Sequence, residues 1–171
     1  CDYALIIDGK GGQALKHPYV DVSQKTGIAK YSVRLQPDGS AFETLNLTFN
    51  RNDSIAKRYV LLHQNEIDKK KFMDSLESYT KGGQILKYDV SGTGDIYSFL
   101  TSSVEIENRD YAKRYGRIMI FGNRSKDFIS PFSLKERKYP LWLNGESKDI
   151  TLSEYTIPKG FKIEYLPPDV N

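Results

Sequence analysis

Apolar and polar residues alternate over much of the chain. Residues 31–35 carry tyrosine, valine and leucine at every second position, and residues 45–49 carry leucine, leucine and phenylalanine in the same way. The segment Pro37-Asp38-Gly39-Ser40 lies between them. Proline fixes φ and glycine can take a positive φ, so this segment favours a turn. The pattern predicts a two-stranded hairpin with one buried face.

The spacing changes to a helical period between residues 53 and 81. Ile55, Tyr59 and Leu62 recur at intervals of four and three residues, which puts them on one apolar face of a helix, although the segment also fits a strand. A second helix should follow Asn65, a suitable N-cap, and end before Gly82-Gly83. Its predicted apolar face consists of Phe72, Met73, Leu76 and Tyr79.

Strand-like alternation returns at residue 85. Six further strands are predicted, separated by glycine, proline, asparagine or charged residues: 85–90, 99–107, 116–122, 136–143, 148–157 and 161–166. Residues 3–7 form another, which runs into a hairpin turn at Gly9–Gly12. Pro158 and Pro167-Pro168 bracket the last strand, because proline cannot donate to a ladder.

These elements predict a mainly β, α+β fold. We expect antiparallel, β-sandwich-like sheets with a short helical insertion near residues 53–81. The length of 171 residues suits a single β-rich domain or fragment over residues 1–171. It can be divided into residues 1–122, with the hairpin, helices and strands, and residues 123–171, with the C-terminal strands.

Composition narrows the classes of partner. The net charge is +3, and the one basic triplet, Lys69-Lys70-Lys71, has Asp68 and Asp74 close by. No basic surface is indicated, so we expect no nucleic-acid partner. No apolar run approaches the roughly 18 residues of a membrane span, so the chain is not expected to cross a membrane.

The single cysteine, Cys1, excludes an internal disulfide and a zinc site with several cysteines. The sequence starts without an initiator methionine or a signal peptide, which suggests a processed chain or a fragment. An N-terminal cysteine also fits a lipidated mature terminus, as in bacterial lipoproteins. Both alternatives stay open.

No catalytic constellation emerges from the residue spacing. Cys1 is terminal, His17 precedes Pro18 in a predicted loop, and His63 lies on the first predicted helix, so we expect structural or solvent-exposed roles for both histidines. Residues 89–95 contain glycines and carboxylates but lack the spacing of a calcium loop, which favours a flexible turn. We therefore predict no catalytic residues, no metal site and no cofactor.

The C-terminal segment carries a recognisable pattern. It contains Pro131-Phe132, then Arg137 with Pro140, then Ile157-Pro158 with Gly160-Phe161, Ile163 and Leu166-Pro167. This arrangement resembles the β-rich domain of unknown function that follows the core of bacterial, Bacteroidetes-type transglutaminase-like or putative protease proteins. The likeness is collinear over most of the chain, and its motifs are structural rather than catalytic.

The resemblance implies a non-catalytic accessory domain of a cell-envelope protein, periplasmic or at the cell surface. The family's catalytic Cys, His and Asp lie in the core, and no residue of this chain matches them. The expected partner is that upstream core, on which the domain would pack or for which it would bind substrate.

Two other functions are open. The chain could be an independent carbohydrate- or peptide-binding β-sandwich module, for which Trp142 is the candidate binding residue if its ring is exposed on a flat aromatic patch. An enzyme that uses paired carboxylates is the other alternative, but the spacing singles out no pair.

Overall fold

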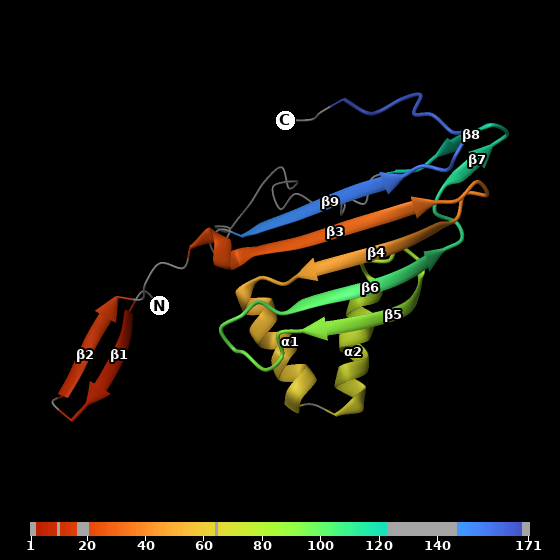
Figure 1. The fold of residues 1–171 in the computed structure, drawn as a ribbon. Coiled ribbons are helices and arrows are strands. Elements are labelled where there is room, and N and C mark those ends of the chain that lie inside the picture. The colour runs from red at the N-terminus through yellow and green to blue at the C-terminus, as the bar shows by residue number, and fades with distance from the viewer. Residues whose placement is uncertain (1–2, 10, 17–20, 64, 123–146, 169–171) are drawn as a thin grey trace, which may run out of the picture.

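A five-stranded sheet forms the centre of the molecule. The computed structural model describes residues 3–9, 11–16, 21–63, 65–122 and 147–168. The strand order is β5-β6-β4-β3-β9, and Figure 1 shows the strands side by side. Their bounds are β3 (Thr26–Leu35), β4 (Ala41–Thr48), β5 (Gln84–Ser91), β6 (Thr101–Asn108) and β9 (Lys148–Thr156). The pairs β5–β6, β6–β4 and β4–β3 are antiparallel, whereas β9 runs parallel to β3.

The predicted hairpin is confirmed in β3 and β4. Its register pairs Leu35 with Ala41, and the turn between them contains Gly39 at a φ of 98°. The amide of Ala112 donates to the Gly39 carbonyl at 2.9 Å, and an added Cβ on this glycine would lie 2.8 Å from the Ala112 carbonyl oxygen. Both the conformation and the close approach therefore require glycine.

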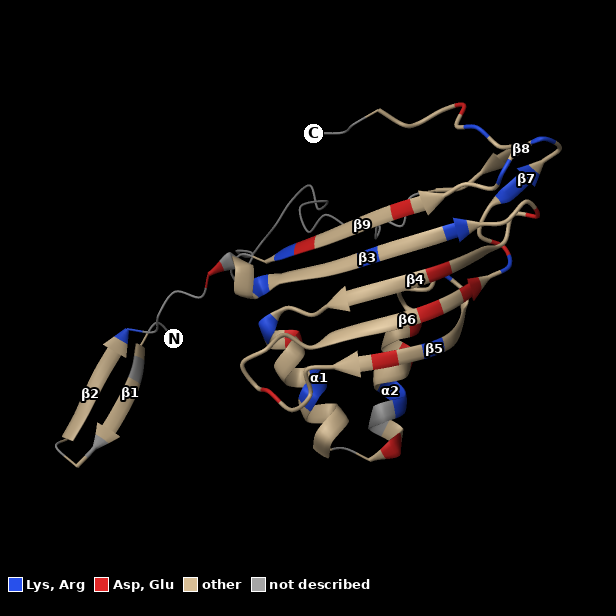
Figure 2. Cartoon of the chain, viewed as in Figure 1, with Lys and Arg blue, Asp and Glu red and all other residues tan. Residues whose placement is uncertain are grey.

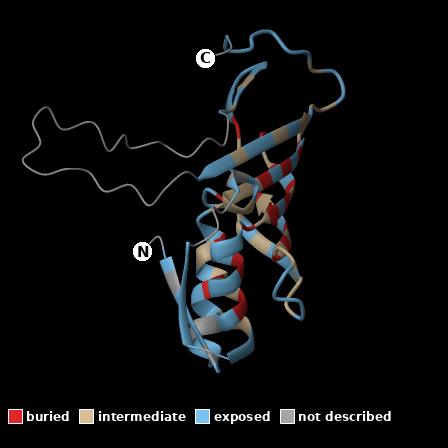
Figure 3. Cartoon of the chain, turned by 90° about the vertical axis from the view of Figure 1, so that its left-hand side faces the viewer, coloured by how far each residue is buried: buried red, intermediate tan, exposed pale blue. Residues whose placement is uncertain are grey.

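Two helices cover one face of the sheet, α1 (Arg51–His63) and α2 (Glu66–Glu77) (Figures 1 and 3). The second helix matches its prediction: Asn65 accepts a hydrogen bond from the Ile67 amide at 2.9 Å, and Phe72 and Leu76 are buried. Met73 and Tyr79 pack against the same core. The helical insertion predicted near residues 53–81 is thus confirmed.

The predicted apolar face of α1 is wrong. Ile55, Tyr59 and Leu62 are each more than half exposed, while Ser54 and Arg58 are buried against the sheet side. The spacing identified a helix correctly but not its orientation. Hydrogen bonds between these two buried side chains and the backbone at Phe49, Gly92, Ser98 and Leu100 accompany this orientation.

The core lies between the sheet and the helices. It is formed by every second residue of three strands, together with helical and loop residues: Ala29, Tyr31, Val33, Leu35, Ala41, Leu45, Leu47, Phe49, Phe72, Leu76, Leu100, Val104, Ile106 and Ala112. The mainly β, α+β class is confirmed. In the described part of the chain, the layer that packs on the sheet is the helix pair.

Two small hairpins flank the sheet. β1 (Tyr3–Asp8) and β2 (Gly11–Lys16) form the predicted N-terminal hairpin, and the short 3-10 helix η1 (Val22–Lys25) precedes β3. β7 (Lys113–Tyr115) pairs with β8 (Ile118–Ile120), of which only the second was predicted. An aromatic cluster lies beside this second hairpin. It consists of the rings of Tyr111 and Phe121, which flank the hairpin in the sequence, and of Tyr155, which belongs to β9.

The strand predicted at residues 161–166 is wrong. This segment has no regular secondary structure and pairs with no described strand, and Ile163, Tyr165 and Leu166 are exposed. A turn precedes it, in which the Phe161 amide donates to the Pro158 carbonyl at 3.1 Å. Alternation of apolar and polar residues does not by itself ensure that another strand lies alongside to form hydrogen bonds. The strand predicted at 136–143 lies outside the described residues.

Candidate binding surface on the open face of the sheet

The face of the sheet opposite the helices is polar and accessible. Successive residues of a strand point to opposite faces, so the residues that alternate with the core positions face outward. The outward residues of the central strands include Lys30, Ser32, Arg34, Phe42, Thr44, Asn46, Ser103, Glu105 and Glu107. Figure 1 views the molecule from this side, with the helices behind the strands.

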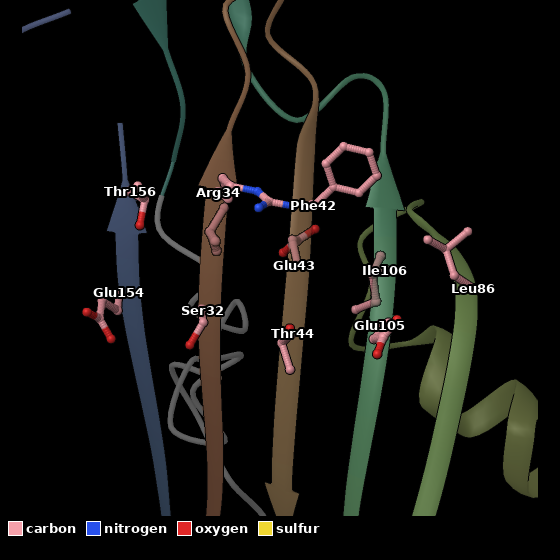
Figure 4. Close-up of a pocket in the computed structure, with 11 residues that line it drawn as sticks. Ser32, Arg34, Phe42, Glu43, Thr44, Leu86, Glu105, Ile106, Glu154 and Thr156 are labelled. Carbon is pink, nitrogen blue, oxygen red and sulfur yellow. The ribbon is translucent and has the colours of Figure 1, made fainter. Parts of the chain in front are cut away.

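A shallow groove of about 530 Å³ crosses this face between β9 and β5 (Figure 4). Arg34 of β3 and Phe42 of β4 form its most distinctive feature, because the guanidinium carbon lies 5.7 Å from the centre of the phenyl ring. Phe42 is 39% exposed, so part of the ring is available to a ligand. This contact is a cation–π interaction on the surface.

Carboxylates and hydroxyls surround the Arg34–Phe42 pair. Glu154 lines the groove from β9 and Glu105 lines it from β6, with Ser32 and Thr44 between them (Figure 4). The arrangement offers hydrogen-bond donors and acceptors across a flat surface beside one aromatic ring. Such a surface can bind a ligand that has both polar groups and an apolar patch.

Charged side chains are spread over the sheet without a single dominant sign. Figure 2 shows acidic residues on β5, β6 and β9 and basic residues on β3 and at the start of β9, whereas Glu43, the acidic residue of β4, is buried. The surface therefore does not have the uniformly positive character of a nucleic-acid interface.

A second arrangement holds the loop between β5 and β6. The buried Arg58 of α1 donates three hydrogen bonds to this loop: two to the Gly92 carbonyl, at 3.0 and 2.8 Å, and one to the Ser98 carbonyl at 3.0 Å. Gly92 has a φ of 85°, and an added Cβ would lie 2.7 Å from the Phe99 carbonyl oxygen. The loop thus has a specific conformation that exposes Ile96 and Tyr97, the latter to 79%.

Ser54 completes this attachment one helical turn before Arg58. Its hydroxyl donates to the Phe49 carbonyl at 3.0 Å and accepts from the Leu100 amide at 3.0 Å. The burial of these two residues could not be predicted from the sequence, since both are polar and most of their partners lie far away in the chain. The turn predicted at residues 89–95 begins later than expected, because Asp89 and its two successors belong to β5.

The N-terminal hairpin has exposed apolar side chains on both faces. Leu5 and Ile7 lie on one face of β1 and Ile6 on the other, with Leu15 of β2 on the Ile6 side. All four are exposed, Ile7 to 76%. A two-stranded hairpin is at best marginally stable by itself in water, so these side chains call for a packing partner.

The candidate residues from the sequence do not meet in a common site. Cys1, His17 and Trp142 lie outside the described residues. His63 is exposed at the end of α1, on the helical side of the sheet, and its ring centre is 5.3 Å from that of Tyr59. In the part of the chain that the structure describes, no group of three or more His, Cys, Asp or Glu side chains could hold a metal ion.

Among the residues that the structure describes, the carboxyls of Asp21 and Asp38 have a lowered pKa, and both belong to local turns. The Ser40 amide, followed by its hydroxyl, donates to Asp38 and lowers the pKa of that carboxyl. Hydrogen bonding from Ser23 lowers the pKa of Asp21, which caps η1. Neither residue lines the groove, so both shifts reflect local structure.

Comparison with protein-family models, curated proteins and solved structures found no significant match. None of the described helices is long and apolar enough to cross a membrane.

Proposed function

We propose that this chain is a non-catalytic accessory domain of a bacterial cell-envelope transglutaminase-like protein, in which it packs on the upstream core. The β1–β2 hairpin is the observation that carries this proposal. Its large apolar side chains are exposed on both faces, whereas the central sheet has a complete core of its own. The hairpin extends away from the sheet in Figure 1, where it could reach a neighbouring domain.

The energetics favour such a partner. Full burial of a leucine or isoleucine side chain stabilises by ~1.5–3 kcal/mol. Burial of Leu5, Ile6 and Ile7 against another domain would therefore provide a substantial docking energy. The collinear resemblance to the domains that follow transglutaminase-like cores supports the identity of that partner and a location in the periplasm or at the cell surface.

A calorimetric titration tests the docking. The full chain is titrated into the transglutaminase-like core of the same protein, and we expect saturable binding. The double variant Leu5→Asp/Ile7→Asp should lose this binding, since it places two charges in the interface. The matched control is Ile118→Asp in β8, an exposed isoleucine on the other hairpin, which should bind like the unmodified chain.

Two results would reject the proposal. One is a core that does not bind the unmodified chain. The other is enzymatic activity of the chain alone, measured as amine crosslinking or peptide hydrolysis in the absence of any core.

The groove on the open face supports a second candidate function, the binding of a carbohydrate or a peptide. The Arg34–Phe42 contact, flanked by Glu105 and Glu154, carries this candidate. Glycan and peptide arrays should then identify ligands whose binding is lost in Arg34→Ala and retained in Lys57→Ala on α1. Trp142 stays a predicted contributor.

A further inference from the structure

We propose that β9 pairs antiparallel with β9 of a second copy of this chain, so that two five-stranded sheets join into one. β9 is the last strand on its side of the sheet, and no described strand pairs with its outer edge. It is nine residues long, without proline or a bulge. This inference goes beyond the proposed function and involves a different part of the molecule.

The two edges of the sheet differ in how open they are. The ladder of β5 with β6 is irregular between Ile85 and Lys87, and such bulges discourage further pairing on an edge strand. β9 pairs with β3 in an uninterrupted register from Lys148 to Thr156.

The sequence of β9 is complementary to itself in one antiparallel register. With Thr151 opposite its own copy, Lys148 lies opposite Glu154 and Ile150 lies opposite Leu152. Each of these pairs occurs twice by symmetry. Lys148 and Glu154 lie near opposite ends of the strand, as this register requires. Opposite charges and apolar pairs directly across a ladder are stabilising.

The adjacent register lacks this match. With Leu152 opposite its own copy, Ile150 would face Glu154 and Lys148 would face Thr156. A one-residue slip between these two registers would put outward side chains opposite inward ones. Charge and hydrophobicity therefore select the register centred on Thr151.

Leu152 provides independent support for a partner on this edge. It is 50% exposed on the open face, where its neighbour on β3 is Lys30. In the dimer, Ile150 and Leu152 of both copies would form an apolar cluster around the two-fold axis. An isologous contact of this kind is the usual route to a closed dimer.

Sedimentation equilibrium of the full chain and its charge-reversed variants tests the pairing. We expect a monomer–dimer equilibrium for the unmodified chain. Lys148→Glu and Glu154→Lys should each raise the dissociation constant about tenfold, because each places like charges opposite one another twice. The double variant Lys148→Glu/Glu154→Lys should restore dimerisation. Circular dichroism verifies that every variant is folded.

Disulfide formation tests the register. In a Cys1→Ser background, Thr151→Cys should form a covalent dimer on oxidation, because this residue faces its own copy at the axis. Thr156→Cys, at the end of the same strand, should not. The proposal is overturned by a monomer at every soluble concentration, by a double variant that fails to recover dimerisation, or by equal crosslinking of both cysteine variants. None of these measurements involves the transglutaminase-like core, so they are independent of the calorimetric docking test.

Discussion

The two faces of the central sheet are built from the same strands but have different roles. On β4, Leu45 points to the helices and is 0% exposed, whereas Phe42 points outward and is 39% exposed. The difference arises because the two helices cover one face only. A small number of buried polar side chains, such as Ser54 and Arg58 of α1, lie on that covered side. Alternation therefore defines two faces, while the packing partner decides which face becomes core.

The largest effect should come from the core of the covered face. Leu45→Ala removes a fully buried side chain between the sheet and the helices, so we expect a loss of about 3 kcal/mol in the free energy of unfolding. Urea unfolding followed by circular dichroism measures it. The matched control on the same strand is Phe42→Ala, which should cost less than about 1 kcal/mol. Similar losses for both variants would contradict the contrast between the faces.

Arg58→Met should have the next largest effect. The substitution keeps most of the side-chain volume but removes the three hydrogen bonds to the Gly92 and Ser98 carbonyls. We expect a loss of about 2 kcal/mol, because carbonyls that accepted from a charged donor lose that partner. Urea unfolding gives the energy, and amide hydrogen exchange of residues 92–99 should become faster.

The control for that variant is Arg109→Met, since the side chain of Arg109 is 80% exposed. Its effect should stay within about 0.5 kcal/mol. If Arg58→Met left the exchange of the loop unchanged, α1 would not be what holds the loop in place.

Ser54→Ala tests the same helix–sheet contact with a smaller change. It removes the hydroxyl that joins the Phe49 carbonyl to the Leu100 amide, and we expect a loss of about 1 kcal/mol by urea unfolding. Ser78→Ala is the control, because that hydroxyl is exposed and bonds only one turn back. Equal effects of the two substitutions would argue against a specific role for the buried serine.

The smallest effect should come from the exposed turn between β3 and β4. Hydrogen bonds from Ser40 lower the folded-state pKa of Asp38 below its ordinary value of 3.8. The stabilisation is therefore fully present above that value and is lost as the pH falls through the lower folded pKa. Asp38→Asn should remove this dependence, so its unfolding free energy should fall less than that of the unmodified chain between pH 5 and pH 2. The same fall in both proteins would show that the Ser40 bonds do not stabilise the carboxylate.

The local features of this fold could be predicted from the sequence. The β3–β4 hairpin, the second helix with Asn65 at its start, and the β1–β2 hairpin were correctly placed. Each depends on residues close together in the chain, namely alternation on two strands and turn or capping residues between elements. The α+β class follows from the order of these local patterns.

Only the tertiary structure decided which surfaces are covered. The sequence pattern predicted a strand at residues 161–166 and an apolar helix face with Ile55, Tyr59 and Leu62. The segment pairs with none of the described strands, and the face is exposed. The sequence pattern gave no indication of the parallel pairing of β9 with β3, of the buried Arg58, or of the groove beside Arg34 and Phe42. The physical reason is the same in each case. Periodicity is a property of neighbouring residues, whereas ladder pairing and burial depend on segments that meet only after the chain has folded.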